Sequence, residues 1–464
     1  MMKKILVFDL GTTYFKICLF DDTGRLLGLQ RLATPIENPL EGRAEIPIPT
    51  FRQSLLEGTR NLSLEVGGLE DVAALSFASQ ANSFTLLDQD DQPLTPFILW
   101  TDQRALGEDN PLEALVESSE FYQRTGVPSM NHEFLAYKVA WLRRHEPAIV
   151  KQTSRLVQIS DYLTWWMSGN HLIEAGVAGL TGLADIHQCE WWPEACAHIK
   201  LPLSWLPRIV RAGTDAGPIN RCVADEFGLP HDCRFIVGCL DQYAGAIGAG
   251  NVEPGSVSET TGTVLATVRC SDHFLQDAPN GVFQGPAAWP GHYYQMVFSD
   301  ISAGLLERYR NSFADRPSFA SLDELAAKIP RGAEGLRLHP DAARQKIDCF
   351  FVNRQPHHTR GHEVRAILEA VAAELQRQIE SLCGKDRPSL VHSVGGAARS
   401  KLWLKIKCEQ LGIDVQATNC CEPTSLGAAM LAVHALTKIP STDIWQSWLH
   451  LGQLKDIDNS HNMG

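Results

Sequence analysis

The stretch Lys4-Ile5-Leu6-Val7-Phe8-Asp9-Leu10-Gly11-Thr12-Thr13, close to the start of the chain, decides the fold. Its apolar, β-prone residues end in a tight turn at 9–13, and a second apolar run follows at 14–20. A further turn signal at 21–24 leads into Arg25-Leu26-Leu27. The pattern predicts a strand, a tight turn, a returning strand and a second hairpin turn.

A related turn recurs near the middle of the chain. Thr260-Thr261-Gly262-Thr263 follows 256–259 and precedes the apolar run 264–268. When Gly11-Thr12 is aligned with Gly262-Thr263, strands flank the turn in both copies. We therefore predict an internal duplication, with similar domains at 1–250 and 251–464 that face one another across a cleft. The turn signal at 251–255 is the natural linker.

Strands and helices are mixed along the whole chain, which is typical of an α/β protein. The other predicted strands include 72–77, 84–87 and 389–394. The predicted helices include 52–64, 135–144, 364–381 and 425–434.

The composition excludes several classes of protein. The formal net charge of -13 over 464 residues argues against a nucleic-acid partner, whose footprint would be a basic stripe. No apolar run approaches the ~18 residues of a membrane span, so no membrane partner is expected. The 12 cysteines are scattered without Cys-x-x-Cys spacing. We expect a cytoplasmic protein with reduced thiols.

The first turn is a candidate phosphate site. Gly11, Thr12 and Thr13 would expose backbone N–H groups and hydroxyls, which suit phosphate oxygens. Asp9, at the strand end, can hold Mg²⁺ through water, because Mg²⁺ prefers a carboxylate together with phosphate ligands. The alternative is an ordinary hairpin with an Asx turn.

The second turn, with Thr261, Gly262 and Thr263, is a weaker candidate by itself. A Thr-rich hairpin is its plain alternative, and the pairing with the first turn strengthens the phosphate interpretation. The two copies are asymmetric, because Thr260 stands where the first copy has Asp9.

Gly395-Gly396-Ala397 and Ser400 lie between a predicted strand and a predicted helix. Glycines allow a ligand to approach the backbone closely, and a helix N-terminus favours negative charge. These residues are therefore the candidate nucleotide site. The alternative is a glycine-rich connector that only packs tightly.

Asp241 is the candidate general base. It follows an apolar run at 235–237 and precedes the small residues of 244–250, which predicts a buried strand with a carboxylate at its tip and then a closely packed helix. A helix N-cap is the structural alternative. Together with the phosphate turns, Asp241 indicates phosphoryl transfer to a hydroxyl.

Polar side chains follow two further predicted strands. Gln80 and Asn82 lie at one strand end, and Asp102 and Arg104 follow Trp100 at another. Such side chains can bind sugar hydroxyls, and Trp100 could support them. A surface ion pair between Asp102 and Arg104 is the alternative.

Two other clusters favour structural roles. The pairs Trp165-Trp166 and Trp191-Trp192 are interpreted as core or interdomain residues rather than sugar-stacking platforms. His357, His358 and His362 lack the carboxylate or cysteine spacing of a metal site, and we expect a surface loop there.

In their order along the chain, these motifs resemble the FGGY carbohydrate kinases of the actin-like ATPase superfamily. Residues 9–13 and Gly262-Thr263 look like the two phosphate motifs of that family. Residues 98–104 are similar to its Leu-Trp-x-Asp-x-Arg segment, Gly238-x-x-Asp241-Gln242 to its catalytic-base motif, and 395–403 to its adenosine motif. The other segments that match in order are Thr125-Gly126, Lys138 with Trp141, 161–163, Leu206-Pro207 with Gly213, Glu422 and 426–429.

The resemblance implies two ribonuclease-H-like domains with ATP and a sugar in the cleft between them. It implies that Asp241 takes a proton from a sugar hydroxyl, that Gln242 belongs to the substrate side, and that Mg²⁺ lies near Asp9 and Asp241. A homodimer is an expectation from the family alone.

The chain departs from the substrate motifs of two subfamilies. Xylulose kinases usually show Gly-Gln-Met-His-Gly where this chain has Ala78-Ser79-Gln80-Ala81-Asn82, and the Asn-Gln-Arg-Glu stretch of glycerol kinases is absent. We predict an ATP-dependent kinase for a small carbohydrate, a xylulose-like ketose or a polyol. The alternatives are an actin-like ATPase with a scaffold or regulatory role, and a catalytically silent sugar-binding relative.

Overall fold

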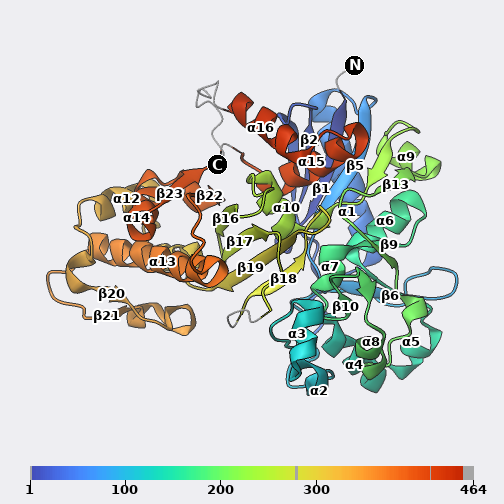
Figure 1. Cartoon of the computed structure of the whole chain (residues 1–464), viewed down its shortest axis with the longest axis horizontal. Coiled ribbons are helices and arrows are strands. Elements are labelled where there is room, and N and C mark those ends of the chain that lie inside the picture. The colour runs from blue at the N-terminus through green and yellow to red at the C-terminus, as the bar shows by residue number, and fades with distance from the viewer. Residues whose placement is uncertain (1–2, 277–280, 419, 453–464) are drawn as a thin grey trace.

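The computed structural model describes residues 3–276, 281–418 and 420–452. Two mixed β-sheets, one from each half of the chain, form its framework (Figure 1). A segment inserted into the first half forms a smaller lobe with its own four-stranded sheet.

The first sheet contains the predicted hairpin. Its path runs β13-β14-β5-β1-β2-β3, and β15 pairs with β5. The strands are β1 (Lys4–Leu10), β2 (Tyr14–Phe20), β3 (Leu26–Ala33), β5 (Val72–Ser79), β13 (Asp215–Pro218), β14 (Arg234–Ile236) and β15 (Cys239–Leu240). β1 runs antiparallel to β2 and parallel to β5.

The second sheet repeats this arrangement. Its order is β18-β19-β17-β16-β22-β23, with β16 antiparallel to β17 and parallel to β22. The strands are β16 (Val257–Thr261), β17 (Leu265–Ser271), β18 (Phe283–Pro286), β19 (Tyr293–Ser299), β22 (Leu390–Val394) and β23 (Asp414–Ala417). The series β14-β5-β1-β2-β3 therefore matches β23-β22-β16-β17-β19 in order and direction, which confirms the predicted duplication.

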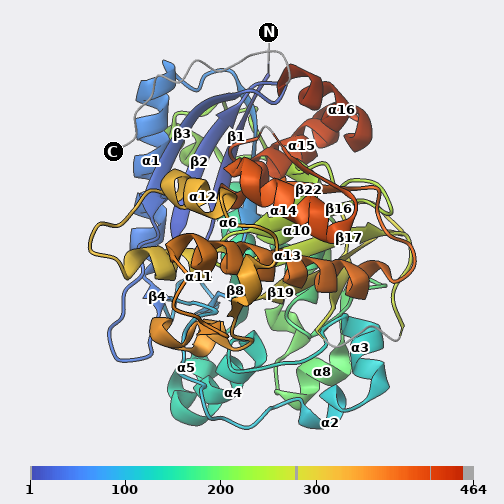
Figure 2. The ribbon, with the colours of Figure 1, turned by 90° about the vertical axis from the view of Figure 1, so that its left-hand side faces the viewer.

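The predicted helices are all present and extend a few residues beyond their predicted ends. They are α1 (Ile48–Val66), α4 (Leu135–His145), α13 (Arg360–Cys383) and α15 (Pro423–Thr437). The other helices around the two sheets are α6 (Ile159–Ser168), α9 (Arg221–Phe227), α10 (Asp241–Gly248), α11 (Ala303–Asn311), α12 (Phe319–Ala327), α14 (Lys401–Leu411) and α16 (Ser441–Gly452). Figure 2 shows α13 and α14 in front of the second sheet.

The smaller lobe is built from short elements. Its four-stranded sheet has the order β4-β7-β6-β8. These strands are β4 (Glu45–Ile46), β6 (Phe84–Leu87), β7 (Phe97–Ile98) and β8 (Arg155–Gln158). The short helices and strands around them are α2 (Glu113–Val116), α3 (Ser119–Thr125), α5 (Pro147–Gln152), β9 (Leu172–Glu174), α7 (Ala175–Gly179), β10 (Ala184–Asp185), β11 (Glu190–Trp191), α8 (Pro193–His198) and β12 (Arg208–Val210). A two-stranded sheet, β20 (Arg337–Leu338) with β21 (Phe351–Val352), lies in the second half.

Both faces of the first sheet are buried. Side chains alternate between the faces along a strand, so Leu6 and Phe8 of β1 pack into the core beneath α1, while Ile5 and Val7 pack on the opposite side. That second core is continuous with residues of the second sheet, among them Met296. The two halves of the molecule thus share one apolar interior.

Two helices cross at this shared interior with almost no space between them. A Cβ on Gly248 of α10 would lie 1.9 Å from the carbonyl oxygen of Pro423, and a Cβ on Gly427 of α15 would lie 1.9 Å from that of Ala244. Only glycine fits at these positions. The small-residue pattern that predicted a closely packed helix after Asp241 is confirmed.

The predicted boundary near residue 250 separates the two sheets but not all of the helices. β16 begins the second sheet after α10 has ended. However, α15 comes from the second half of the chain and packs on β1 and β5 of the first sheet (Figure 1). The division at 250 therefore stays a prediction. No helix in the described part of the chain is long and apolar enough to cross a membrane.

Candidate active site

Three parallel strands bring the main candidate residues to one edge of the first sheet. Asp9 of β1 is opposite Ala78 of β5, which is in turn opposite Cys239 of β15. All three strands end within two residues of this level, so the segments that follow them share the same edge. The register therefore places Asp9, Gln80 and Asp241 at the same edge of the sheet.

Asp241 is the first residue of α10 and is partly exposed. Its Oδ1 accepts the amide N–H of Gln242 at 2.7 Å. Burial of the carboxyl group, together with the nearby charge of Asp9, raises the pKa of Asp241 to about 7. Leu240, not Asp241, occupies the N-cap position, so the N-cap alternative is wrong. Gln242 is also partly exposed beside it.

Glu174 anchors the backbone just before Asp241. Its carboxylate accepts the amides of Gly176 at 2.7 Å, Val177 at 2.9 Å and Leu240 at 3.2 Å. Burial raises the pKa of Glu174 to about 7 despite these hydrogen bonds. Glu174 therefore connects α7 to the start of α10 by hydrogen bonds. The sequence did not single out this residue.

Asp9 is almost fully buried and has a cationic partner. Nζ of Lys16 lies 3.1 Å from Asp9 Oδ2 and 2.6 Å from Glu422 Oε2. Burial raises the pKa of Asp9, and Lys16 opposes that effect. Lys16 was also missed from the sequence, although a lysine within the apolar run of β2, opposite Asp9 across the hairpin, was a signal.

The first Gly-Thr turn is braced by its neighbours. Thr34 donates its hydroxyl to the carbonyl of Gly11 at 3.0 Å, and its amide donates to the carbonyl of Thr13 at 3.0 Å. The hydroxyl of Thr12 accepts the indole N–H of Trp100 at 2.9 Å. Thr13 is exposed, while Gly11 and Thr12 are partly exposed. The turn is thus ordered and accessible, as a phosphate site requires.

The two strand-end amides on the sugar side are buried. Gln80 donates to the carbonyl of Leu10 at 3.3 Å and accepts the hydroxyl of Ser83 at 2.9 Å. Asn82, with a φ of 61°, donates to the carbonyl of Leu180 and accepts the amide of Leu135. The Gln80 amide is thus bonded to the end of β1 and the Asn82 amide to Leu180 and Leu135, and the assignment of both to the substrate stays a prediction.

Asp102 and Arg104 form an ion pair that is buried rather than on the surface. The carboxylate of Asp102 accepts Nε and Nη2 of Arg104 at 2.7 and 2.9 Å, and Nη2 also bonds to Glu45. Burial works against ionisation, but the hydrogen bonds from Arg104 and Ala44 hold the pKa of Asp102 below its ordinary value. The ion pair of the alternative interpretation is present, but its surface location is wrong, and the assignment of both residues to the substrate stays a prediction.

A buried lysine supports the same strand end. Lys138 is fully buried and donates from Nζ to the carbonyls of Trp100 at 2.7 Å and Glu133 at 2.8 Å. Burial lowers the pKa of Lys138 to about 7. The lysine fixes the backbone at Trp100, a residue that remains partly exposed.

The second Gly-Thr turn meets the Gly-Gly turn at one edge of the second sheet. Thr260 of β16 is opposite Val394 of β22, so Gly262 and Gly395 leave neighbouring strand ends. Gly262 is partly exposed and Thr263 is exposed, but Thr261 is fully buried with its hydroxyl bonded inside the protein.

The Gly-Gly turn is open to solvent. Gly395 has a φ of 88°, and both Gly395 and Gly396 are exposed. A 3-10 turn over Gly396–Arg399 separates the glycines from α14, so the helix begins later than the pattern predicted. Ala397 is buried, and Ser400 caps α14 by accepting the amide of Trp403 at 3.0 Å.

The carboxylates suit Mg²⁺ bound together with phosphates. Asp9 and Asp241 lie at the same edge and interact electrostatically. Within the described residues, no group of three or more His, Cys, Asp or Glu side chains could hold a metal ion by itself. Mg²⁺ commonly takes one or two carboxylates and completes its shell with water and substrate phosphates. The residues present therefore fit that ion.

The His-rich patch is not the surface loop that the sequence predicted. His358 and His362 are buried, and His362 Nε2 lies 3.3 Å from a carboxylate oxygen of Glu334. His362 Nδ1 accepts the amide of Thr359 at 3.1 Å, which caps α13. Only His357 is largely exposed among the three.

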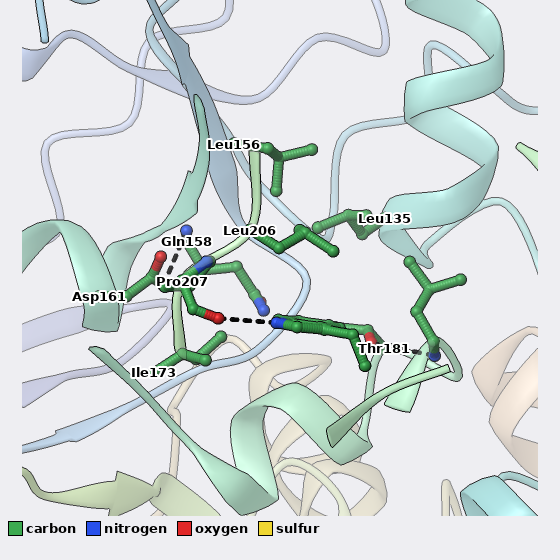
Figure 3. Close-up of a pocket in the computed structure, with 10 residues that line it drawn as sticks. Leu135, Leu156, Gln158, Asp161, Ile173, Thr181, Leu206 and Pro207 are labelled. Atoms are coloured by element: carbon green, nitrogen blue, oxygen red, sulfur yellow. Dashed lines mark hydrogen bonds between the residues drawn. The ribbon is translucent and has the colours of Figure 1, made fainter. Parts of the chain in front are cut away.

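A small cavity lies in the smaller lobe, where its lining residues Leu135 and Gln158 are hydrogen-bonded to Asn82 (Figure 3). It has a volume of about 10 Å³ and is lined by residues that include Gln158, Asp161 and Trp191. None of the predicted site residues lines it. The cavity is about the size of one water molecule.

Comparison with known proteins identifies the family. Residues 4–248 match the N-terminal domain of the FGGY family of carbohydrate kinases, and residues 336–436 match its C-terminal domain. The chain belongs to the FGGY family of carbohydrate kinases. The FGGY resemblance, the two-domain α/β fold class and the prediction of an ATP-dependent carbohydrate kinase are therefore confirmed.

The FGGY relatives match over nearly the whole chain. A gluconokinase of Bacillus subtilis is 23% identical over 96% of this chain and 90% of its own length. A xylulose kinase of Lactococcus lactis is 24% identical over 100% of this chain and 94% of its own. The crystal structure of a gluconate kinase from Lactobacillus acidophilus superimposes with a TM-score of 0.87 at 22% identity, covering 96% of this chain and 92% of that one.

Proposed function

We propose that this FGGY kinase transfers the γ-phosphoryl group of ATP to a hydroxyl of a ketose or polyol, with Asp241 as the general base. The observation that carries the proposal is the Asp241 carboxylate at the shared strand edge, beside Asp9 and the first Gly-Thr turn. A pKa of about 7 leaves it part ionised at neutral pH, where a general base is most effective.

Phosphoryl transfer requires mainly positioning and charge stabilisation. The exposed backbone at Gly11–Thr13 and at Gly262–Thr263 would bind phosphate oxygens from the two halves of the molecule. Lys16 offsets the negative charge of Asp9 at this edge. Gly395, Gly396, Ala397 and Ser400 would form the nucleoside side of the site.

Asp241 would accept the proton of the substrate hydroxyl. At the same time the hydroxyl oxygen of the substrate would form a bond to the γ-phosphorus of ATP, and the bond from that phosphorus to the β-phosphate oxygen, which leaves with ADP, would break. Asp9 and Asp241 would hold Mg²⁺, which when bound neutralises charge on the transferring phosphates. Gln242 and Trp100, both partly exposed, would contact the substrate. Gln80, Asn82, Asp102 and Arg104 would shape that side of the site from their buried positions.

The test is ADP release from Mg·ATP over a panel that contains xylulose, gluconate, fuculose and glycerol. The wild type should respond strongly to one compound, and Asp241→Asn should respond roughly 10²–10⁴-fold less. Asp71→Asn is the matched control, because Asp71 forms only a surface pair with Lys4 at 3.0 Å. Sugar binding by the wild type without any turnover would favour the silent relative instead.

A further inference from the structure

A fully buried ion pair lies under the second Gly-Thr turn. Lys407 Nζ of α14 and Glu259 Oε1 of β16 are 2.5 Å apart, and both side chains are 0% exposed. They are 148 residues apart in sequence. Neither residue was singled out from the sequence.

The pair connects the strand ends from which the two nucleotide-side turns emerge. The hydroxyl of Thr261 donates to Glu259 Oε2 at 2.6 Å and accepts from Lys407 Nζ at 2.8 Å. The hydroxyl of Ser393 donates to Glu259 Oε1. Thr261 directly precedes Gly262, and Ser393 lies two residues before Gly395. One carboxylate thus holds both strand ends and, through Lys407, the helix that follows the Gly-Gly turn.

Stability alone does not account for this pair. Removing two charges from water is costly, and apolar side chains of similar size are often equally or more stabilising at such positions. The surrounding core, which includes Val257, Val391 and Ile406, is apolar. A polar network in which each member is bonded fixes one arrangement of its neighbours, which an apolar contact does not do.

We propose that Glu259 and Lys407 are positioning residues that hold the turns at Gly262 and Gly395 in the arrangement that receives the nucleotide phosphates. The pair does not touch the nucleotide, because both side chains are fully buried. The inference rests on the proposed function only in assigning these turns to the nucleotide.

The test is the double variant Glu259→Leu/Lys407→Met, which removes both charges and keeps the volume. Single substitutions would leave one unpaired buried charge and unfold more easily. The double variant leaves the buried hydroxyls of Thr261 and Ser393 without their partners, so we expect it to fold and to melt somewhat below the wild type. Its Kd for Mg·ADP and Mg·ATP, measured by calorimetry without sugar, should rise about tenfold. That rise is the effect expected if the displaced turns lose one or two hydrogen bonds to the nucleotide phosphates. The KM for ATP should rise in parallel, and the KM for the sugar should not change.

Lys405→Met is the matched control on the same helix. Lys405 is exposed and lies 3.8 Å from Glu409, so its loss should leave nucleotide affinity unchanged. A folded double variant with wild-type nucleotide affinity would overturn the proposal.

If the double variant does not fold, Thr261→Val decides the question, because it removes the linking hydroxyl and leaves the ion pair. A several-fold weaker affinity for Mg·ADP supports the proposal, and an unchanged affinity overturns it. A wild type that binds Mg·ATP but phosphorylates no sugar would refute the proposed function and leave this inference standing.

Discussion

Trp100 donates its indole N–H to the hydroxyl of Thr12 at 2.9 Å, although the two residues are 88 positions apart in sequence. Thr12 belongs to the proposed phosphate turn, and Trp100 to the proposed substrate side. The Trp100 backbone is fixed on both sides, since its amide donates to Ser83 and its carbonyl accepts from Lys138. The substrate side is therefore connected to the phosphate turn through a single rigid residue.

Trp100→Phe should weaken ATP use while keeping the aromatic surface. The variant removes one hydrogen bond to the phosphate turn, worth about 0.5–1.5 kcal/mol, so the KM for ATP should rise roughly 2–10-fold. Steady-state kinetics with both substrates would measure it. Trp191→Phe is the matched control, because the Trp191 indole donates to Pro207 at 2.7 Å in the smaller lobe. Equal effects from the two variants would show that only general stability had changed.

Activity should depend on the ionisation of Asp241. A base with a pKa of about 7 is protonated below neutrality, so kcat/KM should fall about tenfold per pH unit below 7. The folded-state pKa lies above the ordinary value, so the ionised carboxylate destabilises the native state as pH rises. Asp241→Asn should therefore melt higher than the wild type at pH 8 and about equally at pH 4. A variant that melts lower at pH 8 would contradict the assigned environment.

Much of the fold could be predicted from local patterns. The Gly-Thr turns mark the start of each half, and their similarity predicted the duplication that the two sheets show. Apolar periodicity predicted helices at 52–64 and 364–381, and the structure has α1 and α13 there. Strand ends and glycines also marked candidate residues that the structure brings to one edge of each sheet, and their assignment to a site stays a prediction.

Residues whose role depends on a distant partner could not be predicted. Lys407 is one lysine among several on α14, and only the folded chain shows that it meets Glu259. The burial of Asp102, which the surface-pair alternative did not anticipate, has the same reason, since its carboxylate is bonded to Arg104 and to the amide of Ala44. Sequence also placed His358 and His362 on the surface, because their partner Glu334 lies more than 20 residues earlier.

Lys16→Met should damage both stability and activity. Lys16 bridges Asp9 and Glu422, and its loss leaves two largely buried carboxylates without their cation. Removing one partner of a buried pair costs about 3–5 kcal/mol, and partial exposure of Lys16 should reduce that cost to about half. Urea unfolding would measure it. Lys4→Met, which breaks the more exposed pair with Asp71, should cost less than about 1 kcal/mol. Equal costs would contradict the bridging role.

Asp161 should make the protein less stable as the pH rises. The side chain is buried beside the small cavity in Figure 3, and its Oδ2 has no hydrogen-bond partner among the described residues. Burial raises the pKa of Asp161 well above its ordinary value, so ionisation opposes folding at any pH above the unfolded pKa of about 4. Asp161→Asn keeps the acceptor for the amide of Gln158 and cannot ionise. It should match the wild type at pH 4 and exceed it at pH 8, as measured by urea unfolding. If the wild type is more stable than Asp161→Asn at pH 8, burial does not raise the pKa of Asp161 and the prediction is wrong.

Gly248→Ala should displace the helix that carries Asp241. The new Cβ would lie 1.9 Å from the carbonyl oxygen of Pro423, a backbone atom that cannot rotate away. Overpacking of this kind costs about 1–3 kcal/mol, and kcat should fall with it because α10 must move away from α15.

Gly245→Ala, three residues earlier on the same helix, is the matched control. Its Cβ would lie 3.4 Å from the side-chain hydroxyl of Thr424, an ordinary contact. A helical glycine replaced by alanine without a clash gains about 0.5–1 kcal/mol, so Gly245→Ala should be at least as stable as the wild type and fully active. If both variants behave alike in thermal melts and turnover, the close crossing of α10 and α15 does not hold the Asp241 carboxylate in place.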